Sequence, residues 1–112
     1  MSVKLKVNTY MDVAVVELRD KALDASNSES FKKGVAGTLE TFQKVIIDLS
    51  RVEFIDSSGC GALLSCLRQL GDRGGRLRVC GVQKNVQRLF ELVRMNRIVD
   101  IYSNKEEAVK GF

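Results

Sequence analysis

Two adjacent serines have the clearest chemical potential in this sequence. Ser57 and Ser58 stand between Asp56 and Gly59, where an apolar segment leads into a predicted amphipathic helix. The first backbone N–H groups of a helix have no partner within it, and the helix dipole is positive at that end. A phosphate on either serine would be stabilised there without melting the fold. The same spacing suits a purely structural role, in which one of the serines caps the helix.

The content of histidine and cysteine excludes several kinds of catalysis. The chain has no histidine, so it can form neither a Ser-His-Asp triad, nor a Cys-His pair, nor an HExxH zinc site. Cys60, near the predicted helix start, could be a redox thiol with a lowered pKa, but its place on the apolar stripe favours the core. Cys66 and Cys80 are predicted core residues. An odd number of cysteines without a CxxC pair indicates reduced thiols in a cytoplasmic protein.

Cofactor and enzyme motifs are incomplete. The segment that starts at Gly59 and Gly61 resembles GxGxxG, but Leu64 stands where the third glycine should be, and there is no P-loop. Asp48 and Asp56 have no nucleophile or metal-ligand cluster beside them in the sequence. We therefore expect no enzyme activity, no cofactor and no metal.

The elements that would position the serines alternate along the chain. The predicted strands run from Val3 to Asn8, Val13 to Arg19, Lys44 to Ser50, Arg76 to Val82 and Ile98 to Tyr102. The predicted helices follow a capping box at Ser26 to Glu29, cover Gly59 to Arg73, pass through Val86 to Val93, and follow a second capping box at Ser103 to Glu106. The order β-β-α-β-α-β-α-β-α predicts an α/β fold, with a mixed, mostly parallel sheet on which helices pack. The length predicts one domain over residues 1–112.

Charge and hydropathy narrow the range of partners. The net charge is +4, with 8 basic and 9 acidic residues over 1–56 and 10 basic and 5 acidic over 57–112. A basic half could favour an acidic partner or nucleic acid, but the arginines are scattered and no nucleic-acid motif is present. There is no apolar run of about 18 residues and no signal peptide. We expect no nucleic-acid binding and no membrane span.

Four segments together resemble a known family. Asp-Ser-Ser-Gly-x-Gly over 56–61 follows Val-Ile-Ile-Asp-Leu-Ser over 45–50. The resemblance also includes Leu23 to Asn27 and the strand Gly75-x-Leu77-x-Val79. This combination resembles the STAS domain of anti-sigma-factor antagonists, and the likeness covers essentially the whole chain. It implies the STAS fold as a single domain over 1–112.

The resemblance implies a cytoplasmic bacterial partner switch. The unmodified antagonist binds an anti-sigma factor that is also a GHKL-type serine kinase, which frees the sigma factor. The kinase phosphorylates the motif and the antagonist leaves, until a PP2C-type phosphatase resets it. The alternatives are a STAS scaffold that is never phosphorylated, and a switch that controls another process, such as secretion or biofilm formation.

The resemblance also implies roles for individual residues. The acceptor is Ser58, the residue before Gly59, with Ser57 as the second choice. Asp56 positions the hydroxyl and contacts the kinase. The implied partner-binding surface consists of Asp24, Asn27, Asp56, Ser57, Ser58 and Gly59, on a protein that is a monomer when free. Two features depart from the family pattern: Cys60 replaces a common leucine, and the net charge is positive.

Overall fold

The protein is built around a five-stranded sheet. The computed structural model describes residues 2–112. The strand order is β1-β2-β4-β6-β7, in which β1 and β2 are antiparallel and the other pairs are parallel. These strands are β1 (Leu5–Tyr10), β2 (Val13–Leu18), β4 (Lys44–Asp48), β6 (Arg76–Cys80) and β7 (Asp100–Tyr102). The predicted mixed, mostly parallel sheet is confirmed.

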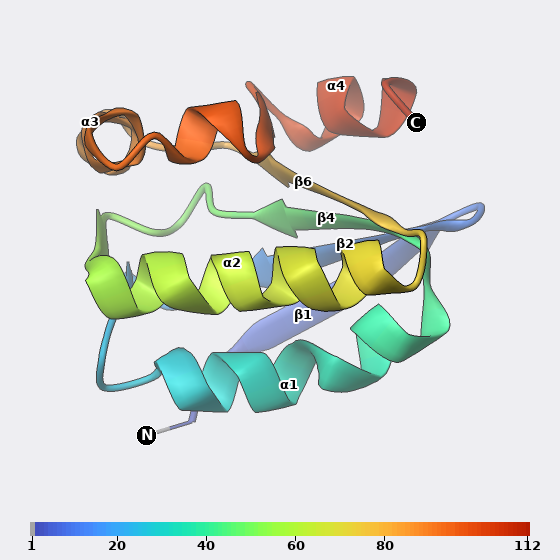
Figure 1. Ribbon diagram of the computed structural model, residues 1–112, viewed down its shortest axis with the longest axis horizontal. Helices are drawn as coiled ribbons and strands as arrows, with labels where there is room; N and C mark the ends of the chain where they lie inside the picture. The colour runs from blue at the N-terminus through green and yellow to red at the C-terminus, as the bar shows by residue number, and fades with distance from the viewer. Residues whose placement is uncertain (1) are drawn as a thin grey trace.

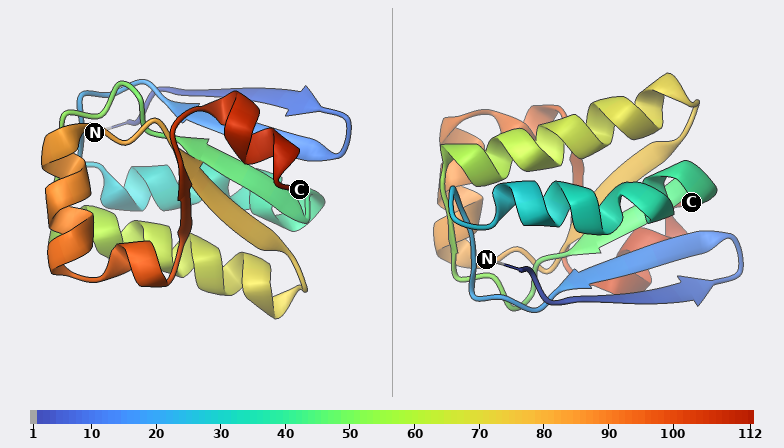
Figure 2. Two further views of the ribbon diagram at one scale, coloured as in Figure 1. Left: turned by 90° about the horizontal axis from the view of Figure 1, so that it is seen from above. Right: turned by 90° about the horizontal axis from the view of Figure 1, so that it is seen from below.

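Helices cover both faces of the sheet. They are α1 (Ser28–Thr41), α2 (Ser57–Asp72), α3 (Lys84–Leu92), the short 3-10 helix η1 (Met95–Arg97) and α4 (Lys105–Lys110). In Figure 1, α1 and α2 lie side by side in front of the sheet, and α3 and α4 lie along its upper edge. The views from above and below in Figure 2 agree with this arrangement. The helix N-terminus that carries the two serines therefore belongs to an element packed firmly on the sheet.

Strand periodicity divides the core into two parts. On β2, Ala14 and Val16 face the main core under α1 and α2, whereas Val13 and Val15 face a smaller cluster that includes Ala108 of α4. This is the alternation expected of a pleated strand. The residues Val45, Ile46 and Ile47 of β4 are fully buried, as their continuous β-branched run predicts.

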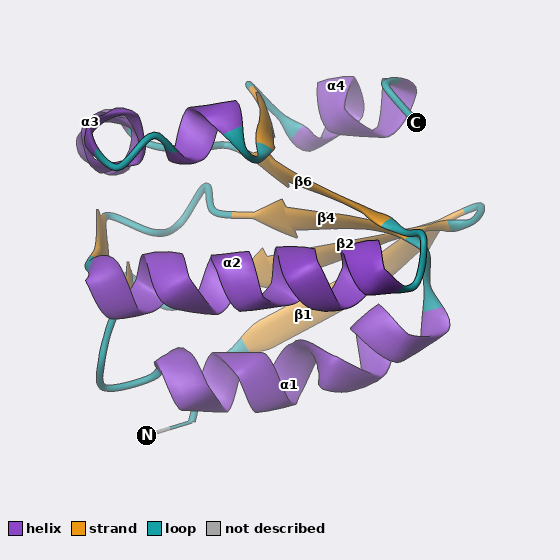
Figure 3. Ribbon diagram, viewed as in Figure 1, coloured by secondary structure: helices purple, strands orange, loops and turns teal. Residues whose placement is uncertain are grey.

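A second, very small sheet was missing from the predicted order. Strands β3 (Ala22–Leu23) and β5 (Phe54–Ile55) pair in parallel (Figure 3). Two residues are too few to show a period of two, so neither strand has a pattern in the sequence. The pair is nevertheless important, because it joins the chain before α1 to the chain before α2.

Both predicted capping boxes are wrong. Helix α1 starts at Ser28 after Asn27, and the Ser26 hydroxyl donates to Asp24 at 2.6 Å instead of capping the helix. Helix α4 is capped by Asn104, whose Oδ1 accepts from the backbone N–H of Glu107 at 2.9 Å. In α4 the asparagine beside the serine provides the cap acceptor, whereas no side chain caps α1.

Candidate functional site

Asp56 organises the start of α2. It is the N-cap residue, and its Oδ1 accepts from the backbone N–H of Gly59 at 2.9 Å. Its Oδ2 accepts from the backbone N–H of Ala25 at 3.1 Å. The interpretation of Ser57 or Ser58 as the cap is therefore wrong, because the carboxylate already occupies that position. Asp56 also ties the start of α2 to the loop before α1.

The loop before α1 is held by its own side chains. The Asn27 Oδ1 accepts from the backbone N–H of Asp24 at 2.9 Å, and its Nδ2 donates to the carbonyl of Ala22 at 2.9 Å. The Asp24 Oδ1 accepts from the backbone N–H of Ser26 at 2.9 Å. Asn27 is buried, whereas Asp24 is half-buried. The buried Asn27 side chain therefore holds the loop through its hydrogen bonds. Of the two residues in this loop that were predicted to bind the partner, Asp24 is the more accessible.

Ser57 and Ser58 face solvent. Both residues are exposed, and within residues 2–112 neither hydroxyl makes a hydrogen bond. Their backbone N–H groups are also free of acceptors among these residues. A phosphate on either serine would thus lie at the positive end of a helix of 16 residues, beside unused donors.

Gly59 is required by a close approach of two backbones. A Cβ atom at this position would lie 2.2 Å from the carbonyl oxygen of Leu23 and 2.6 Å from Cγ1 of Ile55. A larger residue would push α2 away from the β3–β5 pair. Gly59 therefore allows the start of α2, which carries the two serines, to lie close to the loop before α1.

Cys60 is a core residue. Its side chain is buried, and burial raises the pKa of its thiol, with a further increase from the Asp56 carboxylate. A reactive thiol needs a lowered pKa and access to solvent, and Cys60 has neither. Cys66 and Cys80 are buried as well, as predicted.

Phe54 is a surface feature of the site that the sequence analysis missed. It is 54% exposed, while its neighbour Ile55 is buried against the core. The short strand β5 thus presents an aromatic ring two residues before Asp56. The alternation of Phe54 and Ile55 was the only indication, and two residues cannot establish it.

No group of three or more residues of the metal-ligating types His, Cys, Asp and Glu is arranged to hold an ion within residues 2–112. Over the same range, no helix has the length and apolar character needed to cross a bilayer.

Known proteins are similar to this chain in sequence. A protein from Thermotoga maritima with a proposed role as an anti-sigma factor antagonist is 30% identical over 102 residues, which cover 89% of this chain and 90% of that protein. An anti-sigma F factor antagonist from Paenibacillus polymyxa is 26% identical over 111 residues, covering 97% and 94%.

Solved structures agree with this likeness. A crystal structure from Thermotoga maritima, of a protein with the same proposed role, superposes with a TM-score of 0.86 at 29% identity, covering 96% of this chain and 92% of that one. The unphosphorylated form of SpoIIAA superposes at 0.71 with 20% identity, covering 97% and 96%. The phosphorylated form from Bacillus superposes at 0.71 with 18% identity, covering 99% and 100%. At these identities SpoIIAA shows likeness of fold alone. The family described as STAS domain matches residues 4–108, and the chain belongs to this family.

Proposed function

We propose that this protein is an anti-sigma-factor antagonist that works as a phosphorylation-controlled partner switch. The unmodified surface around Ser58 binds an anti-sigma factor that is a GHKL-type serine kinase. Phosphorylation of Ser58 releases the complex, and a PP2C-type phosphatase restores the antagonist. In this proposal the protein acts in the cytoplasm, is a monomer when free and catalyses no reaction itself.

One observation carries the proposal. Ser58 is exposed at the second position of α2, two residues after the cap residue Asp56, and its hydroxyl makes no hydrogen bond within residues 2–112. A kinase can therefore reach the hydroxyl without unfolding the helix. Because Asp56 uses both carboxylate oxygens within the chain, its role here is to hold the acceptor segment, more than to contact the kinase directly.

The relatives add support. Two relatives that match most of this chain carry names of this kind. One is named an anti-sigma F factor antagonist, and the other has a proposed role as an anti-sigma factor antagonist. SpoIIAA, which has the same fold, has been solved in an unphosphorylated and a phosphorylated form, so this fold has a precedent for carrying the modification.

Electrostatics provides the release step. A phosphoserine adds a charge of about −1.5 to −2 at neutral pH. In the free protein this charge meets the helix N-terminus, which stabilises it. In a complex the same charge would have to be desolvated beside Asp56, which makes the complex less stable.

The test is incubation with the cognate kinase and ATP, followed by mass spectrometry. We expect one phosphate, on Ser58. The Ser57→Ala variant should still be modified and the Ser58→Ala variant should not. Phosphate found only on Ser57, or on neither serine, would overturn the assignment.

A further inference from the structure

Phe54 is an exposed aromatic residue close to the two serines in the chain. It is 54% exposed, and over residues 12–91 no other large hydrophobic residue is exposed. It belongs to β5, the short strand that leads directly into the start of α2 in Figure 3. The segment before the motif therefore leaves one large apolar side chain in solvent, four positions before Ser58.

The strand that carries Phe54 is held by two neighbouring segments. The backbone N–H groups of Glu53 and Phe54 donate to the carbonyl of Lys21, at 2.6 Å and 3.2 Å. At the start of α3, the Asn85 carboxamide donates to the carbonyl of Glu53. The next residue, Ile55, is buried in the core. The backbone of Phe54 is thus fixed before a partner arrives, which lowers the entropy that binding would cost.

A partner that covers Ser58 also reaches Phe54. The two Cα atoms are four residues apart, so they lie within about 14 Å of each other even along a fully extended chain. A protein interface of ordinary size buries about 800 Å² on each partner, which corresponds to a patch with a radius of about 16 Å. An interface of that size centred on Ser58 therefore extends as far as Phe54.

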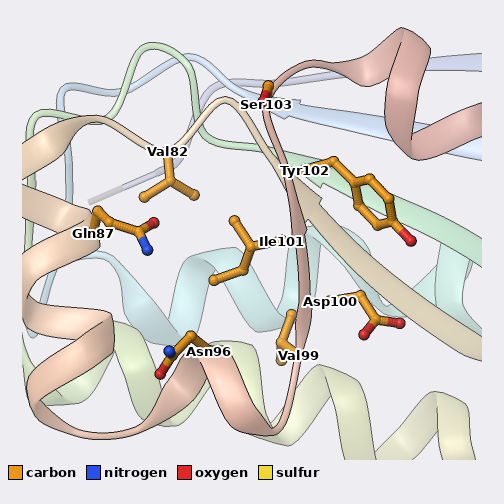
Figure 4. A pocket seen from close by; sticks show the side chains of 8 residues that line it. All are labelled: Val82, Gln87, Asn96, Val99, Asp100, Ile101, Tyr102 and Ser103. Atoms are coloured by element: carbon orange, nitrogen blue, oxygen red, sulfur yellow. The ribbon is translucent and has the colours of Figure 1, made fainter.

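The hollow between α3, η1 and β7 is a different part of the surface. It has a volume of about 650 Å³, and Figure 4 shows the side chains of Val82 and Ile101 extending toward its interior. Its lining includes the carboxylate-bearing residue Asp100, whereas among the described residues none from the segments 21–28 and 50–61 lines it. Phe54, and not this hollow, is therefore the apolar feature that continues the surface around Ser58.

Building on the proposed function, on which this step rests, we propose that Phe54 is the apolar anchor of the partner surface. The anti-sigma factor kinase receives the ring in an apolar pocket beside the site that takes Ser58. Aromatic side chains are frequent among the few residues that carry most of the binding energy of an interface. Phe54 provides affinity that does not depend on charge, while the phosphate on Ser58 decides when the complex dissociates.

The test is the affinity of the kinase for three proteins, measured by calorimetry without ATP: the unmodified protein, Phe54→Ala and Met11→Ala. Met11 is 99% exposed in the turn between β1 and β2, which lies at the opposite end of the molecule from the start of α2 (Figure 1). We expect Phe54→Ala to bind about tenfold more weakly. The control Met11→Ala should bind as the unmodified protein does. The difference should persist as salt is raised, because an apolar contact is not screened.

The kinetics of phosphorylation separate binding from chemistry. Phe54→Ala should raise the KM for this protein as substrate of the kinase by about tenfold and leave kcat unchanged, because the ring contributes equally to the ground state and the transition state. The conservative variant Phe54→Leu keeps an apolar side chain and should recover part of the lost affinity. This recovery would not be expected if the ring acted only through its aromatic character.

Equal affinities of Phe54→Ala and Met11→Ala for the kinase, with Ser58 still phosphorylated, would overturn this assignment and leave the proposed function intact. A kinase that bound none of the proteins would overturn both. A lower kcat at an unchanged KM would overturn the role as an anchor, since the ring would then act on the transfer step. A dimer in sedimentation that Phe54→Ala abolishes would also overturn it, by assigning the ring to a second copy of this chain.

Discussion

At the scale of single residues, the motif depends on a glycine as much as on its serines. Gly59 lies where a Cβ atom would meet the carbonyl oxygen of Leu23 at 2.2 Å, while Gly61 has open space around the same position. We predict that Gly59→Ala lowers the free energy of unfolding by about 1–3 kcal/mol, because the backbones must separate.

The matched control for this prediction is Gly61→Ala. It should raise the free energy of unfolding by about 0.5–1 kcal/mol, since alanine favours the helix interior more than glycine does. Urea denaturation of both variants at neutral pH measures the two changes. Equal effects of the two substitutions would contradict the close approach at Gly59.

At the scale of elements, Asp56 couples the start of α2 to the loop before α1. The variant Asp56→Ala should lose about 1 kcal/mol of stability, the usual effect of removing an N-cap. It should also free the backbone N–H of Ala25, which now donates to the Asp56 Oδ2 at 3.1 Å. Hydrogen exchange at Ala25 should therefore become faster.

Asn104→Ala is the control for the coupling. It removes a cap of similar geometry from α4, away from the serines, and should leave exchange at Ala25 unchanged. If the Ala25 amide exchanged at the same rate in both variants, the hydrogen bond from Ala25 to Asp56 would not be what protects this amide.

The sequence predicted the long elements and missed the short contacts between them. The apolar stripe of α2 has a clear helical period and β4 has a continuous β-branched run, and both elements are where these patterns predict. Strands β3 and β5 have two residues each, and the hydrogen bond from the Ala25 N–H to Asp56 joins segments 31 residues apart. Such details arise from tertiary contacts, which local patterns do not contain.

The same reasoning applies to the candidate site. The positions of Ser57, Ser58 and Gly59 at a helix start follow from the motif itself. The inward orientation of Asn27 and the exposure of Phe54 do not, because each is set by a neighbouring segment. Val93 follows α3 at helical spacing, which predicts a core position, yet its side chain is 47% exposed.

At the scale of the whole molecule, the two-sided core buries all three thiols. Burial raises the pKa of Cys66 to about 11 and the pKa of Cys80 to about 12, from the ordinary value of 9.0. Above pH 9 the unfolded chain releases thiol protons that the folded chain still holds. The contribution of the thiols to the free energy of unfolding is therefore complete below about pH 9. It should fall as the pH rises toward 11.

Urea denaturation at pH 8 and at pH 10 measures this loss. The Cys80→Ala variant should lose less stability between the two pH values than the unmodified protein, because one of the buried thiols is gone. The same loss in both proteins would show that Cys80 does not contribute to the pH dependence.

Negative charge at Ser58 is proposed to release the partner. The most direct test of this release is the affinity of the anti-sigma factor kinase, measured by calorimetry without ATP, for Ser58→Asp, Ser58→Ala and Ser65→Asp. Ser65 is an exposed serine further along α2, so its variant adds the same charge elsewhere on the helix. We predict that Ser58→Asp binds about tenfold more weakly or worse, while the other two bind as the unmodified protein does. Equal affinities for all three variants would contradict the account.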